Sequence, residues 1–243
     1  EAELLETLLD LPIAFHFSII PASSLGRASQ ARQDELEELI DRFRIAIKND
    51  SLGELVTAYT EIPDPASIAN NARENWLSAN RMAVFDPWEI ESPGDAIMEI
   101  SRELEYQLYR QHELRRRAAE LLSILSGQDD LVSSVIRNYP KIDAVFLSAS
   151  QQRKTRAGRS FEHHISAALR AGRIRFEEQA VTGGRRPDFV RPNLEQIRNR
   201  ERERNDALVL AAKTTLRERW KQVASEQLHC DVYLATVDDR VAS

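Results

Sequence analysis

The sequence contains a single cysteine, Cys230, and no hydrophobic run that approaches the ~18–20 residues of a membrane-spanning helix. One cysteine excludes an internal disulfide and fits a reducing compartment. The acidic N-terminus, from Glu1 onward, does not resemble a signal peptide. These absences predict a globular protein that lacks a membrane span and acts in the cytoplasm.

Residues 1–147 also lack a glycine-rich phosphate-binding loop, a His-Glu-x-x-His pair and a nucleophile elbow. Apolar residues in this part recur mainly at helical spacing, which predicts helices at Ser29–Lys48, Leu52–Tyr59, Pro65–Asn80 and Gly94–Leu125. We therefore predict a mostly helical N-terminal region, residues 1–147, that serves packing, dimerisation or contact with the flanks of bound DNA.

The net charge of −6 conceals an asymmetry between the two parts of the chain. Residues 1–150 hold 14 Lys and Arg against 26 Asp and Glu, a net charge of −12, whereas residues 151–243 hold 19 against 13, a net charge of +6. A basic half can be the electrostatic footprint of a nucleic-acid backbone. A solvated surface laced with ion pairs explains the same charge equally well.

The C-terminal part, residues 148–243, alternates between strand and helix patterns. The segment Gln151–Arg159 reads as a basic turn, after which Ser160 is expected to cap a helix that Gly172 terminates. Apolar runs bounded by turn residues predict strands at Ile174–Val181, Asp188–Val190, Ala207–Ala212 and Val232–Val237. This alternation predicts an α/β or α+β unit built on a mixed sheet.

Two charged residues stand at the tips of neighbouring predicted strands. Asp188 begins one strand and Lys213 follows the next. A carboxylate there can bind Mg²⁺, which prefers oxygen ligands, and an ammonium can offset charge that develops on a phosphate during hydrolysis. By themselves, one aspartate and one lysine are a weak signal for catalysis.

Three sequence blocks strengthen the prediction that Asp188 and Lys213 are catalytic. They are QRKTRAGRSFE (152–162), Arg186-Pro187-Asp188-Phe189, and AAKTTLRERW (211–220). In this order and spacing they resemble the C-terminal catalytic domain of EcoRII and the related CCGG-family type II restriction endonucleases, over about residues 145–237. The resemblance implies a PD-(D/E)XK nuclease core at residues 148–243, with a restriction-endonuclease-like mixed sheet flanked by helices. It also implies Mg²⁺-dependent cleavage of double-stranded DNA. We therefore expect a type II restriction endonuclease of a prokaryotic cytoplasm that cuts a short palindromic site with a CC:GG core. Because two-fold DNA symmetry is most simply matched by a two-fold protein, we expect a homodimer, with a tetramer as the alternative.

The resemblance assigns the cutting chemistry to four residues. Asp188 and Lys213 match the family's metal-binding aspartate and catalytic lysine. The usual Glu-x-Lys pattern would need an acidic residue at Ala211, and this family moves that carboxylate to the next helix, which implies Glu226 as the second metal ligand. Glu162 matches a glutamate that completes or tunes the site. Without the family, Glu226 reads as a surface glutamate and Glu162 as a first-turn glutamate favoured by the helix dipole.

The resemblance also assigns the reading of DNA. Arg217, Glu218 and Arg219 match an Arg-(Asp/Glu)-Arg motif that reads adjacent G·C pairs, since arginine can bridge guanine O6 and N7 and a carboxylate can accept from cytosine N4. A capping box between Thr215 and Glu218 is the structural alternative for that glutamate. More weakly, the resemblance implies backbone or minor-groove contacts by the following residues: Lys154, Arg156, Gln151 and Gln152.

Two other functions remain open from the sequence. One is a PD-(D/E)XK nuclease of DNA repair or recombination, which reads DNA structure rather than sequence. The other is a catalytically silent sequence-specific DNA-binding protein. His163 and His164 are not needed as general bases, and the neighbours His229, Cys230 and Asp231 cannot all face one metal ion from a single strand.

Overall fold

The computed structural model describes residues 22–127, 130–180, 187–199, 201–214 and 229–238. The chain divides into two compact units, residues 1–51 and 52–243. The first unit contains the helix α2 (Ala22–Lys48), which includes the predicted helix and begins earlier. Ion pairs from Arg42 to Glu38 and from Arg44 to Asp41, at helical spacing, stabilise its exposed surface. None of the helices in the described ranges combines the length and apolar character needed to cross a bilayer.

The second unit begins with helices, which confirms the predicted helical region. They are α3 (Leu52–Tyr59), α4 (Pro65–Ala79), α5 (Pro93–Glu99), the π-helix η1 (Ile100–Glu105), α6 (Tyr106–Leu125) and α7 (Leu131–Ala171). Two of these helices, α4 and α7, each begin after an aspartate that caps them. Asp64 accepts hydrogen bonds from the first backbone N–H groups of α4, and Asp130 does the same for α7.

A first hydrophobic core lies where α4, the α5–η1 segment and α7 meet. Its buried residues include Trp76, Phe85, Ile100 and Ala168. Trp76 packs its ring against Phe85 and donates its indole N–H to Glu99 Oε2 at 2.8 Å. This core joins the last turns of α7 to the helices that precede it, so the two predicted regions of the chain share packing.

The sheet is mixed, as predicted. Its strands are β1 (Glu177–Glu178), β2 (Phe189–Arg191), β3 (Leu208–Lys213) and β4 (Asp231–Thr236), in the order β1-β2-β3-β4. The β1–β2 and β2–β3 pairs are antiparallel, and β3 pairs with β4 in parallel. The strand predicted at Ile174–Val181 is much shorter than expected, because Gln179 takes a positive φ of 52° that ends the extended conformation.

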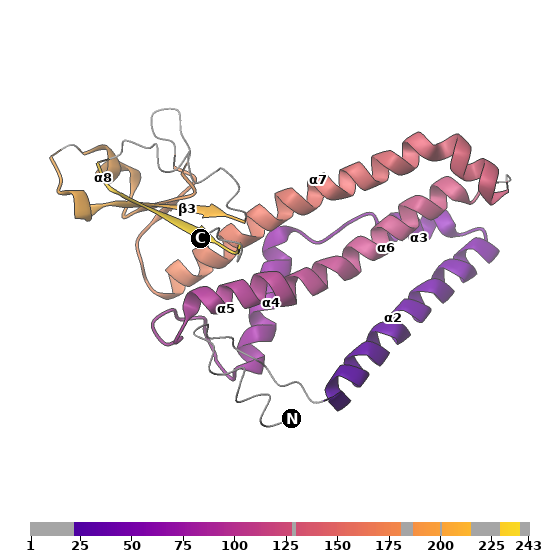
Figure 1. Ribbon diagram of the computed structural model, residues 1–243, viewed down its shortest axis with the longest axis horizontal. Coiled ribbons are helices and arrows are strands. Elements are labelled where there is room, and N and C mark those ends of the chain that lie inside the picture. The colour runs from indigo at the N-terminus through magenta and orange to yellow at the C-terminus, as the bar shows by residue number, and fades with distance from the viewer. Residues whose placement is uncertain (1–21, 128–129, 181–186, 200, 215–228, 239–243) are drawn as a thin grey trace, which may run out of the picture. The chain divides into compact units, whose positions relative to one another are not determined.

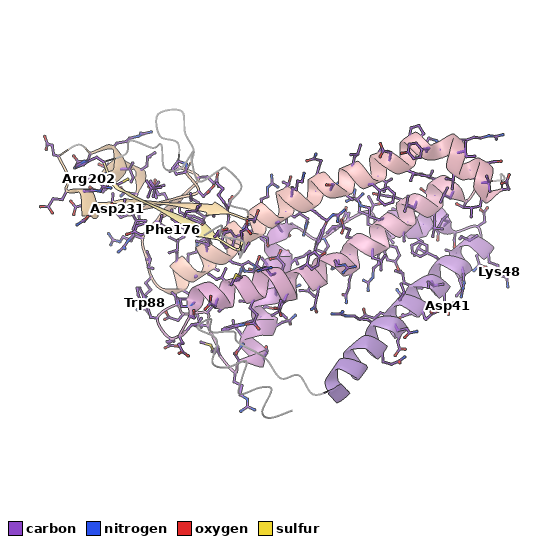
Figure 2. The ribbon with its side chains drawn as sticks, in the orientation of Figure 1. Asp41, Lys48, Trp88, Phe176, Arg202 and Asp231 are labelled. Carbon is purple, nitrogen blue, oxygen red and sulfur yellow. The ribbon has the colours of Figure 1, made fainter. Side chains whose placement is uncertain are left out.

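The sheet lies beside the C-terminal part of α7, with the short helix α8 near it (Figure 1), and each of its faces packs into a core of its own. On one face, Phe189 and Ala212 pack against Phe161 and Ile165 of α7. On the other face, Val190 and Val209 pack against Ile197 of α8 (Leu194–Arg198) and Cys230. Alternate residues of β2 and β3 therefore face opposite cores. Figure 2 shows Phe176, Arg202 and Asp231 in this part of the chain. Cys230 is buried, as expected for a small core residue.

The segment Gln151–Arg159 is helical, so its prediction as a basic turn is wrong. It forms the middle of α7, a single helix of 41 residues. The polar composition and Gly158 suggested a turn, but contacts to α6 hold the helix together here, including an ion pair between Arg153 and Glu113. Ser160 is correspondingly a buried residue within the helix and not its N-cap. The predicted boundary between residues 147 and 148 falls inside α7.

Gly172 ends α7, as predicted, and the reason is close packing. Its φ of −72° is available to any residue. A Cβ at this position would meet Pro87 Cγ at 2.8 Å and Trp88 Nε1 at 3.1 Å. Trp88 donates its indole N–H to the Gly172 carbonyl at 3.0 Å, and Figure 2 labels this tryptophan. Glycine therefore lets the loop before α5 close against the end of α7.

Gly158 offers a direct test of the helical assignment. A Cβ added there would meet no atom within 4 Å. Alanine lowers the conformational entropy of the unfolded chain, so we expect Gly158→Ala to stabilise the protein by about 0.5–1 kcal/mol. Urea unfolding of both proteins measures this difference. A loss of stability would contradict a continuous helix through this segment.

Candidate active site

Asp188 and Lys213 meet at one end of the β2–β3 pair. Because the two strands are antiparallel, the residue before β2 lies beside the end of β3. Asp188 is buried, and its Oδ2 accepts from the Ala212 backbone N–H at 2.8 Å and from Lys213 Nζ at 2.7 Å. Both bonds use Oδ2, so within the described part of the chain Oδ1 keeps its lone pairs for another ligand. The structure thus brings together the two residues that the strand pattern singled out.

A second carboxylate, that of Glu162, faces this pair from α7. Gln179 connects the two acids: its backbone N–H donates to the Asp188 carbonyl at 2.9 Å, and its side-chain amide donates to Glu162 Oε2 at 2.8 Å. Burial, with a further contribution from the charge of Asp188, raises the pKa of Glu162. Two carboxylates that repel each other in this way are the donors that a divalent cation stabilises.

Asp188 and Glu162 therefore provide two of the carboxylate ligands that a hard divalent cation needs. Across the described ranges no three Asp, Glu, His or Cys side chains lie close enough to hold a metal ion together. Asp188 and Glu162 offer carboxylate oxygens, which Mg²⁺ prefers to nitrogen or sulfur. Glu226, expected as a metal ligand, lies outside the described residues, as do Arg217, Glu218 and Arg219.

The weaker DNA-binding candidates all lie on α7. Gln151 and Lys154 are exposed. Gln152 accepts from Arg117 of α6 at 2.8 Å, and Arg156 donates to the Pro63 carbonyl at 2.7 Å with its guanidinium over the Tyr109 ring. Lys154 and Gln151 therefore present their side chains to solvent, whereas Gln152 and Arg156 are tied to neighbouring elements.

Behind Glu162, α7 carries a buried polar network that the sequence did not reveal. Glu105, at the end of η1, accepts from Ser160 Oγ and lies 2.7 Å from His164 Nε2. Arg73 of α4 contacts His164 Nδ1 at 3.1 Å. Because arginine can only donate, Nδ1 accepts and the imidazole proton resides on Nε2, facing Glu105. This neutral tautomer satisfies all three groups and fixes α7 to α4 and η1.

His164 makes stability depend on pH. Burial lowers the pKa of His164 below the ordinary value of 6.5, although Glu105 opposes that shift. As pH falls below about 6.5, the unfolded chain takes up a proton that the folded state does not, so this residue's contribution to the free energy of unfolding decreases. We expect His164→Gln to have a shallower stability loss between pH 7 and pH 5 than the wild type, measured by urea unfolding. Equal slopes would contradict the neutral buried imidazole.

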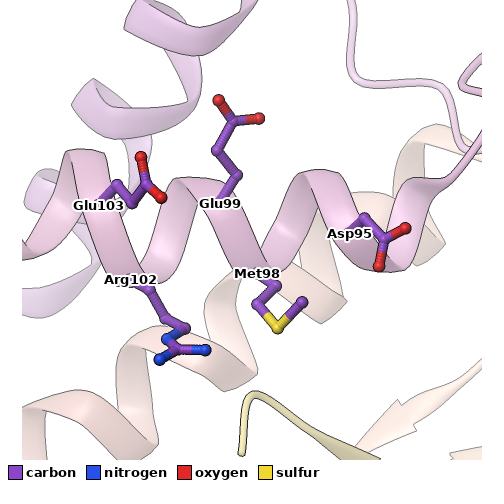
Figure 3. A pocket seen from close by; sticks show the side chains of 5 residues that line it. All are labelled: Asp95, Met98, Glu99, Arg102 and Glu103. Carbon is purple, nitrogen blue, oxygen red and sulfur yellow. The ribbon is translucent and has the colours of Figure 1, made fainter. Parts of the chain in front are cut away.

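A surface pocket lies apart from the Asp188–Lys213 pair. It is lined by Asp95, Met98, Glu99, Arg102 and Glu103, from α5 and η1 (Figure 3). Three of the five are acidic, which disfavours DNA phosphate. Glu99 is already engaged by the indole N–H of Trp76. The pocket does not contribute to the candidate site.

The family model for the EcoRII C terminal matches residues 128–243, which include Glu162, Asp188 and Lys213. Residues 128–243 are therefore similar to the EcoRII C-terminal domain. The type II restriction enzyme EcoRII of Escherichia coli is 30% identical over 135 residues, which are 53% of this chain and 33% of that enzyme. The type II restriction enzyme SsoII of Shigella sonnei is 32% identical over 123 residues, 45% of this chain and 39% of that enzyme. The chain spans between a third and two fifths of these relatives.

Solved structures are similar to more of this chain than residues 128–243. A complex of the restriction endonuclease PspGI with substrate DNA matches with a TM-score of 0.54 and 20% identity, over 74% of this chain and 69% of that one. Metal-depleted Ecl18kI in complex with uncleaved DNA matches with a TM-score of 0.55 and 22% identity, over 78% of this chain and 68% of that one. These matches show a shared restriction-endonuclease-like fold. Since residues 128–243 are less than half of the chain, the shared fold includes helices that precede them.

Proposed function

We propose that this protein is a type II restriction endonuclease that hydrolyses phosphodiester bonds in double-stranded DNA. The observation that carries the proposal is the contact between Asp188 and Lys213 at the end of β2 and β3, with Glu162 beside it, within the residues that are similar to the EcoRII C-terminal domain. The relatives are type II restriction enzymes, and the PspGI and Ecl18kI structures are complexes with DNA.

Asp188 and Glu162 would hold Mg²⁺, with Glu226 as a further ligand. The Ecl18kI complex holds uncleaved DNA in a metal-depleted form, which supports a metal requirement in this group. Bound Mg²⁺ supplies a Lewis acid for the scissile phosphate and lowers the pKa of a bound water. The Lys213 ammonium, held by Asp188 at 2.7 Å, offsets the negative charge that develops on the phosphate during attack by water. Gln179 positions Glu162 through its amide.

The recognition site is proposed to be a short palindrome with CC and GG at its centre, of the CCGG, CCNGG or CCWGG type. Arg217, Glu218 and Arg219 would read the G·C pairs in the major groove. Lys154 and Gln151, both exposed on α7, are the better placed of the four weaker candidates for further DNA contacts. A palindromic site is matched most simply by a homodimer, with a tetramer as a higher assembly, acting in a prokaryotic cytoplasm.

Sequencing the ends of Mg²⁺-dependent digestion products tests this function. Plasmid DNA incubated with the protein should give discrete bands whose ends share one CC:GG-containing sequence. A smear would instead indicate a nuclease that does not read sequence. A gel shift in Ca²⁺ without cleavage after Mg²⁺ addition would indicate a DNA-binding protein that does not cut.

Replacing Arg217 with alanine should relax reading at one position of the site. Loss of a bidentate contact to guanine costs about 1–3 kcal/mol of discrimination at that base pair. Binding to a panel of single-substitution DNA duplexes at fixed salt measures the change. Lys154→Ala is the matched control, since a phosphate contact should weaken binding to all duplexes alike. A uniform loss with Arg217→Ala would assign that side chain to the backbone instead.

A further inference from the structure

Each of the two carboxylates at the candidate site has one oxygen that the protein holds by hydrogen bonds. Asp188 Oδ2 accepts from the Ala212 backbone N–H at 2.8 Å and from Lys213 Nζ at 2.7 Å. Glu162 Oε2 accepts from Gln179 Nε2 at 2.8 Å. In the described part of the chain, no hydrogen bond reaches the other oxygen of either acid. Each carboxylate therefore keeps a single oxygen for a cation.

The residue type at position 179 is not explained by the turn that it forms. Gln179 has a φ of 52°, a conformation that glycine or asparagine adopts at lower cost than glutamine. The backbone N–H donates to the Asp188 carbonyl at 2.9 Å, and any residue except proline could make that bond. Strained backbone that the surrounding structure holds in place is a pointer to function. What glutamine adds here is the side-chain amide, which reaches Glu162.

One face of α7 holds the segment that carries Gln179. The neighbouring Glu178 accepts on Oε1 from Ser166 Oγ at 2.5 Å and from Arg170 Nη2 at 2.6 Å. Glu162, Ser166 and Arg170 are spaced four residues apart, so they lie along the same face of the helix. Because this face contacts both residues of the segment, the amide of Gln179 is fixed relative to Glu162 by contacts other than their own hydrogen bond.

A carboxylate with one oxygen already held suits Mg²⁺ better than Ca²⁺. Mg²⁺ demands near-ideal octahedral geometry, keeps several waters and is bound through about one or two carboxylates. Ca²⁺ takes roughly six to eight oxygen ligands in flexible geometry and accepts both oxygens of one carboxylate. Without the amide of Gln179, Glu162 would offer both of its oxygens, which favours the larger ion.

We propose that Gln179 is a positioning residue that makes the site select Mg²⁺ over Ca²⁺, because its amide holds Glu162 Oε2 and leaves one oxygen of that carboxylate for the cation. The inference deepens the proposed function and rests on it for the presence of a divalent cation at Asp188 and Glu162. Gln179 acts through Glu162 and does not itself bind the ion. Loss of such a partner of a metal ligand typically changes metal affinity by about 10–100-fold.

Thermal unfolding of the full chain in concentration series of MgCl₂ and CaCl₂, without DNA, tests the selectivity. An ion that binds only the folded protein stabilises it as its concentration rises, so the series give a dissociation constant for each ion. The wild type should bind Mg²⁺ more tightly than Ca²⁺. Gln179→Leu, which has a side chain of similar size without a donor, should lower the ratio of the Ca²⁺ to the Mg²⁺ dissociation constant by about tenfold or more. An unchanged ratio in folded Gln179→Leu, or a wild type that does not prefer Mg²⁺, would overturn the proposal.

Two further variants separate the amide from the turn. Gln179→Asn suits the positive φ, but its side chain is one methylene shorter, so it should fold stably and still lose the preference for Mg²⁺. If Gln179→Asn keeps the wild-type ratio, the turn and not the reach of the amide determines the preference, and the proposal fails. Gln107→Leu is the matched control, since Gln107 is exposed on α6, and it should change neither dissociation constant.

This selectivity and the proposed function fail in different ways, which plasmid cleavage by the same proteins distinguishes. Site-specific, Mg²⁺-dependent cleavage by the wild type, together with an unchanged ratio in Gln179→Leu, would keep the nuclease and remove the role of Gln179. A lowered ratio in Gln179→Leu, together with a wild type that cuts no DNA, would keep the role of Gln179 and remove the nuclease.

Discussion

Replacing Lys213 with alanine should slow DNA cleavage by roughly 10²–10³-fold while specific binding remains. Lys213 Nζ lies 2.7 Å from Asp188 Oδ2, and in the proposed reaction it would offset the charge that develops on the phosphate. Loss of one such preorganised group costs roughly 10²–10³-fold in rate. Cleavage of a plasmid in Mg²⁺ measures the rate, and a gel shift with Ca²⁺ measures binding. Because the variant retains the residues proposed to read the bases, its affinity for the specific duplex should change much less than its rate.

Two controls separate catalysis from folding. Lys141→Ala removes an exposed lysine from α7 and should leave cleavage unchanged. Thermal unfolding of Lys213→Ala shows whether Asp188, which still accepts from the Ala212 N–H, tolerates the loss of its ion pair. If a folded Lys213→Ala protein cuts DNA at the wild-type rate, Lys213 has no part in the chemistry.

The centre of the candidate site could be predicted because it depends on local patterns. Short apolar runs bounded by polar residues place Asp188 at the start of β2 and Lys213 at the end of β3. Antiparallel pairing of neighbouring strands then brings these two ends together. The helices α3 and α4 were equally predictable, since their apolar periodicity, and for α4 the capping residue Asp64, lie within or next to the segment itself.

The parts that sequence reasoning missed depend on contacts between distant residues. Gln151–Arg159 has the polar composition of a turn, and only its packing against α6 reveals a helix. Gln179 reaches Glu162 and Asp188 because the chain turns sharply at Gln179, whose φ is positive. No pattern in the sequence predicts that turn. Glu105 meets Ser160 and His164 across 55 and 59 positions of sequence. Each of these is determined by tertiary packing that overrides local composition.

Replacing Glu105 with alanine should destabilise the protein strongly. Glu105 is buried and accepts hydrogen bonds from both Ser160 and His164. Its removal leaves a buried hydroxyl and a buried imidazole N–H without an acceptor, together with a cavity. These effects are expected to cost about 3–5 kcal/mol. Urea unfolding of the two proteins at pH 7 measures the difference in free energy of unfolding.

Two variants show whether that cost comes from the hydrogen bonds. Glu105→Gln keeps the shape of the side chain: its carbonyl can accept from His164, and its amide can donate to Ser160 Oγ, so the loss should be much smaller. Glu103→Ala changes an exposed glutamate of the same π-helix and should stay within about 0.5 kcal/mol of the wild type. An equal loss for Glu105→Gln and Glu105→Ala would mean that the negative charge itself stabilises the network, and His164 would then have to be protonated in the folded protein.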